Sequence, residues 1–152
     1  QECPEFAGIK YTDENLCEFQ RCVDYSDRFQ IMFGRDEMLL ASLAAGAEAG
    51  VGSTYNYAAP LYHRMIAAFR QGDMETARKL QLLSQKLVLL LMRFGGSAGK
   101  QIMELIGQPV GPVRPPTRNT FETNAELAAA LRAIGVAPYL GGELVIGDRI
   151  GA

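Results

Sequence analysis

Residues 29–45 read FQIMFGRDEMLLASLAA, and this one stretch contains a complete structural unit. Its first five residues, 29–33, are mainly apolar, and the polar segment GRDE follows at 34–37. A short apolar run bounded by glycine and charged residues predicts a buried strand. The apolar run at 38–45 predicts a helix, so the stretch predicts one strand, one loop and one helix in succession.

A similar unit precedes it. Residues 6–10 (FAGIK) predict a strand and residues 11–15 (YTDEN) a loop. Leu16, Phe19 and Val23 then recur at spacings of three and four, which places them on one face of a helix.

A third unit follows, with a strand predicted at 49–52, a loop at 53–56 and a helix at 58–71. Pro60 suits the first turn of that helix, where its missing N–H is not needed. Strand, loop and helix repeated without hairpin turns are typical of parallel βα units. The strands are apolar throughout, as expected for strands covered on both faces.

The rest of the chain is mainly helical. Residues 72–135 predict a long helix capped by Asp73 and shorter helices after it, interrupted by the proline-rich segment 107–118. Residues 136–152 show no clear period and predict an irregular tail. We therefore expect three segments: βα units at 1–71, a helical extension at 72–135 and the tail.

The number of strands constrains the architecture. A (β/α)₈ barrel needs eight strands, and an open sheet of three would leave two unpaired edges. The α/β pattern is therefore compatible with an open doubly wound sheet or with a (β/α)₈ TIM barrel. In the second case most of the barrel precedes residue 1, and the three βα units form its C-terminal portion.

Composition excludes several functions. The net charge of −2 gives no basic surface for nucleic acid, and no apolar run is long enough to span a membrane. Cys3, Cys17 and Cys22 lack metal-ligand spacing, and the single histidine, His63, has no second ligand nearby in the sequence. We expect no bound metal.

Ligands of parallel α/β folds bind at the carboxyl ends of the strands. Three loops would meet there, and they contain Lys10, Tyr11, Thr12, Gly34, Arg35, Asp36, Glu37, Gly52, Ser53, Thr54, Tyr55 and Asn56. The sequence therefore predicts one amine, two carboxylates and several hydroxyls on one rim.

Lys10 allows two interpretations. Burial in a dry barrel interior would favour its neutral amine, which can attack a carbonyl carbon. A solvated lysine at a strand end is the ordinary alternative, and the pattern alone favours it.

Asp36 and Glu37 also allow two roles. They could hydrogen-bond sugar hydroxyls, or they could stabilise the N-terminus of their own helix, which the pattern favours. Ser53 follows Gly52 at a helix start, where it could bind an anion or form a routine turn.

The three loops together resemble a known family. GIKYTD at 8–13, FGRDE at 33–37 and GVGSTYN at 50–56 are similar to the C-terminal part of the N-acetylneuraminate lyases, or sialic acid aldolases. GPVRPP at 111–116 is similar to a later segment of that family. The resemblance implies a TIM barrel with added C-terminal helices, a cytoplasmic homotetramer and no cofactor. It also implies a class I aldolase that cleaves N-acetylneuraminate to pyruvate and N-acetylmannosamine.

The resemblance assigns roles to individual residues. It implies that Lys10 forms the Schiff base and that five further residues hold the sugar chain: Thr12, Gly34, Asp36, Glu37 and Ser53. The family's proton-shuttle tyrosine and its Gly-Ser-Thr loop for the substrate carboxylate lie on earlier strands, which this sequence lacks. We therefore expect the chain to be inactive on its own.

Two alternatives stay open. The chain could be a non-catalytic truncated remnant or helical interaction partner, as its large helical share suggests. It could also keep the Schiff base and act on a different 2-keto acid. Small molecules are the expected ligands in both aldolase interpretations.

Overall fold

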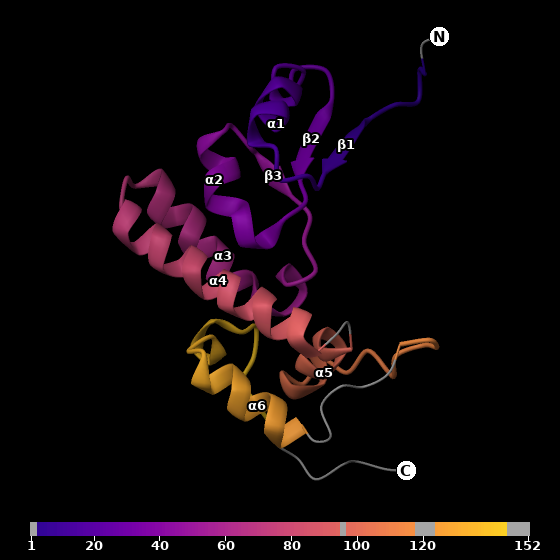
Figure 1. Cartoon of the computed structure of the whole chain (residues 1–152), viewed down its shortest axis with the longest axis vertical. Helices are drawn as coiled ribbons and strands as arrows, with labels where there is room; N and C mark the ends of the chain where they lie inside the picture. The colour runs from indigo at the N-terminus through magenta and orange to yellow at the C-terminus, as the bar shows by residue number, and fades with distance from the viewer. Residues whose placement is uncertain (1–2, 95–96, 118–123, 146–152) are drawn as a thin grey trace.

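The computed structural model of the chain describes residues 3–94, 97–117 and 124–145. Its elements follow one another along the chain from a small sheet to a group of helices (Figure 1). Their bounds are β1 Gly8–Tyr11, α1 Leu16–Val23, β2 Gln30–Phe33, η1 Asp36–Met38, α2 Leu39–Ala44, β3 Ala49–Gly50, α3 Tyr55–Arg70, α4 Met74–Phe94, α5 Ala98–Leu105, α6 Asn124–Ala133 and η2 Ala137–Tyr139.

The three strands form a parallel sheet in the order β1-β2-β3. Lys10 lies opposite Met32, and Met32 lies opposite Ala49. The expected parallel βα units are therefore confirmed. β3 is shorter than the predicted strand at 49–52, because the chain leaves the sheet after the Val51 N–H has bonded to Phe33 O at 2.8 Å.

Helices cover one face of this sheet. Ile31 and Phe33 pack with Phe19 of α1 in a small apolar cluster, while α1 and α2 lie on the same side of the strands (Figure 1). The other face carries Lys10 and Gln30, which are exposed. The expectation that both faces are covered is wrong for the described chain. In a closed barrel the inner face is filled by side chains from all the strands, and three strands cannot enclose it.

Helix α3 begins at Tyr55, earlier than the predicted start at 58. Its first turn is separated from the rest by Ala58, whose φ of −122° and ψ of 25° are not helical. Pro60 therefore lies in the first turn after the break at Ala58. The sequence predicts Pro60 in a first helical turn, and this position fits that prediction. The missing N–H of Pro60 costs least there.

Helices α3 and α4 form the main core as an antiparallel pair (Figure 1). Asp73 caps α4 as predicted, since its Oδ1 accepts the N–H of Thr76 at 3.0 Å. Leu61 of α3 and Leu87 of α4 are fully buried between the helices and their neighbours. Across the described residues, no helix is long and apolar enough to cross a membrane.

The segment after α6 packs onto the helices. Val136 is fully buried, the N–H of Gly141 donates to Tyr57 O at 2.8 Å, and the N–H of Val145 donates to Leu105 O at 2.8 Å. Beyond η2 the segment up to residue 145 has no regular structure. The sequence also predicts that Gly95 and Gly96 end the long helix and that Thr123 or Asn124 caps a later one. Residues 95, 96 and 123 lie outside the described residues.

Candidate active site

The strand ends create a single pocket of about 500 Å³ at one edge of the sheet. The pocket is lined by every residue that the sequence analysis assigned to the site: Lys10, Thr12, Gly34, Asp36, Glu37 and Ser53. They come from three loops that are distant in sequence and adjacent in space because the strands are parallel. Tyr55 and His63 do not line this pocket; they border a smaller one between α3 and β3.

The first strand places Lys10 beside Gly34. A Cβ added at Gly34 would lie 2.9 Å from Lys10 Cε and would overlap Thr12 Oγ1. The Gly34 N–H donates to Tyr11 O at 2.7 Å, which continues the β1–β2 pairing into the loops. Gly34 thus allows the lysine stem and the threonine hydroxyl to pass close to the backbone of the second loop.

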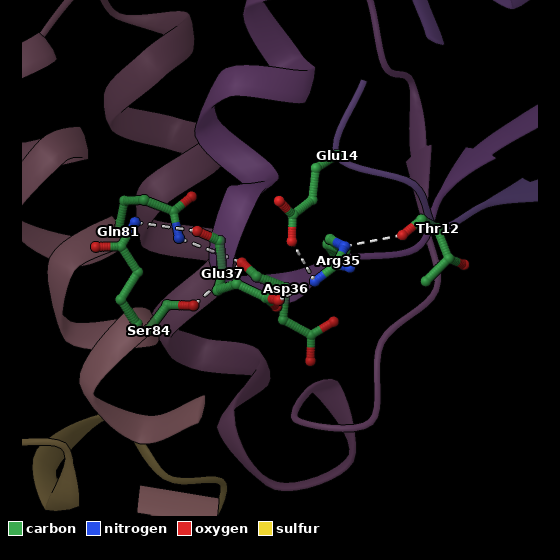
Figure 2. Close-up of polar contacts among 8 residues, drawn as sticks. Thr12, Glu14, Arg35, Asp36, Glu37, Gln81 and Ser84 are labelled. Atoms are coloured by element: carbon green, nitrogen blue, oxygen red, sulfur yellow. Dashed lines mark hydrogen bonds and ion pairs between the residues drawn. The ribbon is translucent and has the colours of Figure 1, made fainter. Parts of the chain in front are cut away.

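Arg35 joins the first two loops, a role that the sequence analysis did not assign. Its Nε donates to Thr12 O at 2.8 Å, and its guanidinium pairs with Glu14 at 3.2 Å and Glu37 at 3.1 Å (Figure 2). Such partly exposed ion pairs add little stability, about 0–1 kcal/mol each. The arginine instead fixes the position of Glu37 relative to Thr12, because its planar group binds several partners at once.

Asp36 is buried, with 5% of its surface exposed, and does not cap its own helix. Its Oδ2 accepts the backbone N–H of Thr54 at 2.9 Å and also the Thr54 hydroxyl. Asp36 thus makes no capping hydrogen bond to its own helix, contrary to the favoured interpretation, although Asp36 and Glu37 both lie in the first turn of that helix. The carboxylate reaches the start of α3, where N–H groups without helical partners attract an anion.

Gly52 makes room for this carboxylate. A Cβ at Gly52 would overlap the Asp36 side chain. The other carboxylate oxygen, Oδ1, accepts no hydrogen bond from the residues that the structure describes. One oxygen of Asp36 thus binds Thr54, while Oδ1 lies against Gly52 without a hydrogen-bond partner among the described residues.

A buried hydrogen-bond network lies behind Asp36. Thr54 Oγ1 lies 2.6 Å from Tyr62 OH, and Tyr62 OH lies 3.0 Å from Ser84 Oγ. Ser84 Oγ in turn lies 3.1 Å from the Asp36 carbonyl oxygen, which also accepts from Gln81 Nε2 at 3.2 Å. Figure 2 shows Gln81 and Ser84 extending from α4 toward the loop.

Burial raises the pKa of Tyr62 to about 12, although its hydrogen bonds with Ser84 and Thr54 act in the opposite direction. Its hydroxyl is therefore protonated at neutral pH and can donate. Burial, with the negative charge of Asp36 second, also raises the pKa of Tyr55. The Tyr55 hydroxyl has no hydrogen-bond partner in the described part of the chain.

The sequence does not predict that α4 contributes to the lining of the pocket. Val88, Leu91 and Met92 line the pocket, so the long helix crosses its mouth. The sequence does contain a sign of the polar network. Ser84 lies four residues after Leu80 and three before Leu87, so a polar residue stands on the apolar face of the helix. A polar residue at such a position needs a partner, and here the partners are Asp36 and Tyr62.

Comparison with known proteins identifies the family. The model of the dihydrodipicolinate synthetase family matches residues 1–134, most of the chain. The chain belongs to the dihydrodipicolinate synthetase family. Members are built as (β/α)₈ barrels, so the three βα units described above are the C-terminal part of such a barrel, followed by helices, as the sequence predicts.

Within the dihydrodipicolinate synthetase family the chain is similar to proteins named N-acetylneuraminate lyase. It is 39% identical to the Mus musculus protein over 137 residues, which cover 86% of this chain and 43% of that protein. It is 41% identical to N-acetylneuraminate lyase A of Xenopus laevis over 122 residues, or 78% of this chain and 40% of that protein. The resemblance stated from the three loops is confirmed.

Solved structures of N-acetylneuraminate lyases also resemble the structure of this chain. The Proteus mirabilis N-acetylneuraminate lyase matches with a TM-score of 0.80 and 40% identity, over 88% of this chain and 46% of that one. The Aliivibrio salmonicida enzyme also matches with a TM-score of 0.80, at 38% identity over 88% of this chain and 45% of that chain. The chain thus spans less than half the length of the relatives it matches.

Proposed function

We propose that this chain supplies the Schiff-base part of a class I lyase that cleaves N-acetylneuraminate to pyruvate and N-acetylmannosamine. The observation that carries the proposal is the pocket at the strand ends, where Lys10 lies with two carboxylates and three hydroxyl-bearing residues. The relatives named N-acetylneuraminate lyase support the choice of substrate. As in the family it resembles, we expect the assembled protein to be a cytoplasmic homo-oligomer.

The neutral Lys10 amine attacks the C2 ketone carbon of the open-chain sugar acid to form a carbinolamine. Loss of water gives an iminium between Nζ and C2. The C3–C4 bond then breaks: its electron pair moves into the iminium, forming an enamine, while the C4 hydroxyl loses its proton and becomes an aldehyde. Protonation of the enamine at C3 and hydrolysis release pyruvate and the free amine. No described residue is assigned to these proton transfers.

The remaining residues hold the sugar chain. The free Oδ1 of Asp36 and the carboxylate of Glu37 accept hydrogen bonds from sugar hydroxyls, and Thr12 and Ser53 contribute hydroxyls of their own. Gly34 contributes room and a backbone near Lys10. Such contacts orient the substrate so that its ketone carbon meets the amine.

The exposed position of Lys10 bears on activity. Lysines that attack carbonyl carbons work in sites from which water is largely excluded. The other strands of a barrel would exclude water from the face that carries Lys10. We therefore propose that the three βα units act only within an assembled eight-stranded barrel.

Pyruvate release tests the function. The assembled barrel should release pyruvate from N-acetylneuraminate, and Lys10→Arg should abolish the release while Lys100→Arg, at a neighbouring pocket, should leave it near wild type. Release by Lys10→Arg at the wild-type rate would contradict the assignment. The barrel could instead be inactive on N-acetylneuraminate and yet form an aldol product from pyruvate and another aldehyde. That result would favour a different 2-keto acid as the substrate.

A further inference from the structure

The loop that carries Asp36 is attached to α4 at its backbone. The Asp36 carbonyl oxygen accepts from Gln81 Nε2 at 3.2 Å and from Ser84 Oγ at 3.1 Å. Gln81 Oε1 also accepts the N–H of Leu40 at 2.7 Å. One face of α4 therefore determines where the main chain of the second loop lies.

A second connection runs through side chains and returns to the same helix. Asp36 Oδ2 accepts from Thr54, whose hydroxyl meets Tyr62 OH at 2.6 Å, and Tyr62 OH meets Ser84 Oγ at 3.0 Å. The backbone and the carboxylate of Asp36 are thus joined in a closed ring that passes through Ser84.

Each member of the ring is almost inaccessible to water. The exposed fractions are 5% for Asp36, 1% for Thr54, 3% for Tyr62 and 0% for Ser84. Water cannot replace a lost bond without a rearrangement, so each bond constrains orientation more than it would at a surface.

The donors are also limited in number. The hydroxyls of Thr54 and Ser84 both donate to Asp36, so only the Tyr62 proton remains for the other two contacts of the ring. Tyr62 therefore donates to Thr54 or to Ser84 at any one time, and three of the four contacts are hydrogen bonds. Every hydroxyl is therefore engaged when the carboxylate is ionised, and none is free to rotate toward the pocket. Thr54 holds Oδ2, and Oδ1 then lies against Gly52.

We propose that Ser84 and Tyr62 are positioning residues that hold the Asp36 carboxylate in one orientation toward the sugar chain. Helix α4, far from Asp36 in sequence, then contributes to substrate affinity through residues that do not touch the substrate. This inference rests on the proposed function, since it assumes that Asp36 Oδ1 binds a sugar hydroxyl.

The kinetic test separates sugar binding from Schiff-base formation. In the assembled barrel, Ser84→Ala and Tyr62→Phe should each raise KM for N-acetylneuraminate about fivefold to tenfold. Trapping of pyruvate on Lys10 by borohydride should stay at the wild-type level, because pyruvate lacks the sugar chain. A loss of folded protein would instead lower trapping and leave KM unchanged.

Ser42→Ala is the matched control. Ser42 is also a fully buried helical serine, but its hydroxyl donates to Leu39 O at 2.8 Å within its own helix. Its replacement should leave KM unchanged. A wild-type KM in both Ser84→Ala and Tyr62→Phe would overturn the proposal.

A double-mutant cycle tests whether Ser84 acts through Asp36. In an Asp36→Asn background, Ser84→Ala should raise KM no further, whereas an equal rise in both backgrounds would contradict the proposal. A crystal structure of Ser84→Ala gives an answer independent of activity, since it should show the carboxylate turned away from Thr54; the wild-type orientation would overturn the inference. A wild-type protein that traps no pyruvate would refute the proposed function instead.

Discussion

Gly52 has no side chain, and this leaves the space that the Asp36 carboxylate occupies. Replacement by alanine would place a Cβ on that carboxylate and force it toward the pocket or the loop backbone. We expect Gly52→Ala to raise KM for the sugar acid on the order of tenfold to a hundredfold, because a small misplacement of a binding group is costly. Steady-state kinetics on the assembled barrel measure this.

Gly99→Ala is the control for that change. A Cβ at Gly99 would meet only the Tyr57 ring at 3.5 Å, an ordinary contact distance. Its KM should equal that of the wild type. An unchanged KM in Gly52→Ala would show that the Asp36 carboxylate does not need its observed position.

The buried tyrosines make stability sensitive to alkali. Burial raises the pKa of Tyr55, Tyr57 and Tyr62 above their ordinary value of about 10, for Tyr62 to about 12. The stability that these tyrosines contribute is fully present below about pH 10, where their hydroxyls are protonated in both the folded and the unfolded chain. It is lost as pH rises further, because the unfolded chain then binds fewer protons.

Urea unfolding followed at several pH values tests this dependence. The free energy of unfolding should fall between about pH 10 and about pH 12, and the fall should be smaller in Tyr62→Phe, which lacks one of the titrating groups. A free energy that stays constant over this range, or equal slopes in the two proteins, would contradict the raised pKa values.

The sequence predicted which residues lie on the rim better than it predicted their hydrogen-bond partners. Lys10 and Gly34 could be placed on one rim because parallel strands end at the same edge. The partner of Asp36 could not be predicted, since the sequence allowed a helix cap and the structure instead directs the carboxylate to Thr54. That choice depends on the space at Gly52, a tertiary property that local propensity does not contain.

At the scale of elements, α4 connects the helical extension to the loops of the sheet. Leu87 is fully buried against the other helices, whereas Leu89, two residues on, is 64% exposed. We expect Leu87→Ala to lower the free energy of unfolding by about 2–5 kcal/mol, because it leaves a cavity in the core. Urea unfolding measures the change.

Leu89→Ala provides the comparison on the same helix. It should change the free energy of unfolding by less than about 0.5 kcal/mol, as is usual for surface substitutions. Similar losses in the two variants would mean that α4 is not packed as described.

The periodicity of the sequence predicts the helix α4 but not its contact with the pocket. Leu80, Leu83 and Leu87 recur at helical spacing and so predict an apolar face, and Asp73 predicts the start of the helix. The contact of Val88 and Met92 with the pocket could not be predicted, because it depends on how α4 crosses the sheet. β3 was predicted too long for a similar reason, since its pairing with β2 ends at the bond from the Val51 N–H to Phe33 O.

At the scale of the molecule, the sheet has two edges, at β1 and β3, and an uncovered face. Parallel sheets are rarely stable with a face open to water, and unpaired edges bind other strands. We expect the chain alone to self-associate, and to become dispersed when a polypeptide with the other five βα units is added. Analytical ultracentrifugation distinguishes the two states. A compact monomer of the isolated chain would instead favour a non-catalytic remnant.

Borohydride trapping of pyruvate, followed by peptide mass mapping, tests the role of Lys10 most directly. The chain contains four lysines: Lys10, Lys79, Lys86 and Lys100. In the assembled barrel the reduced adduct should appear on Lys10 alone, and the isolated chain, in which Lys10 is exposed, should trap far less. An adduct on another lysine, or no adduct on Lys10 in the assembled barrel, would contradict the Schiff-base mechanism.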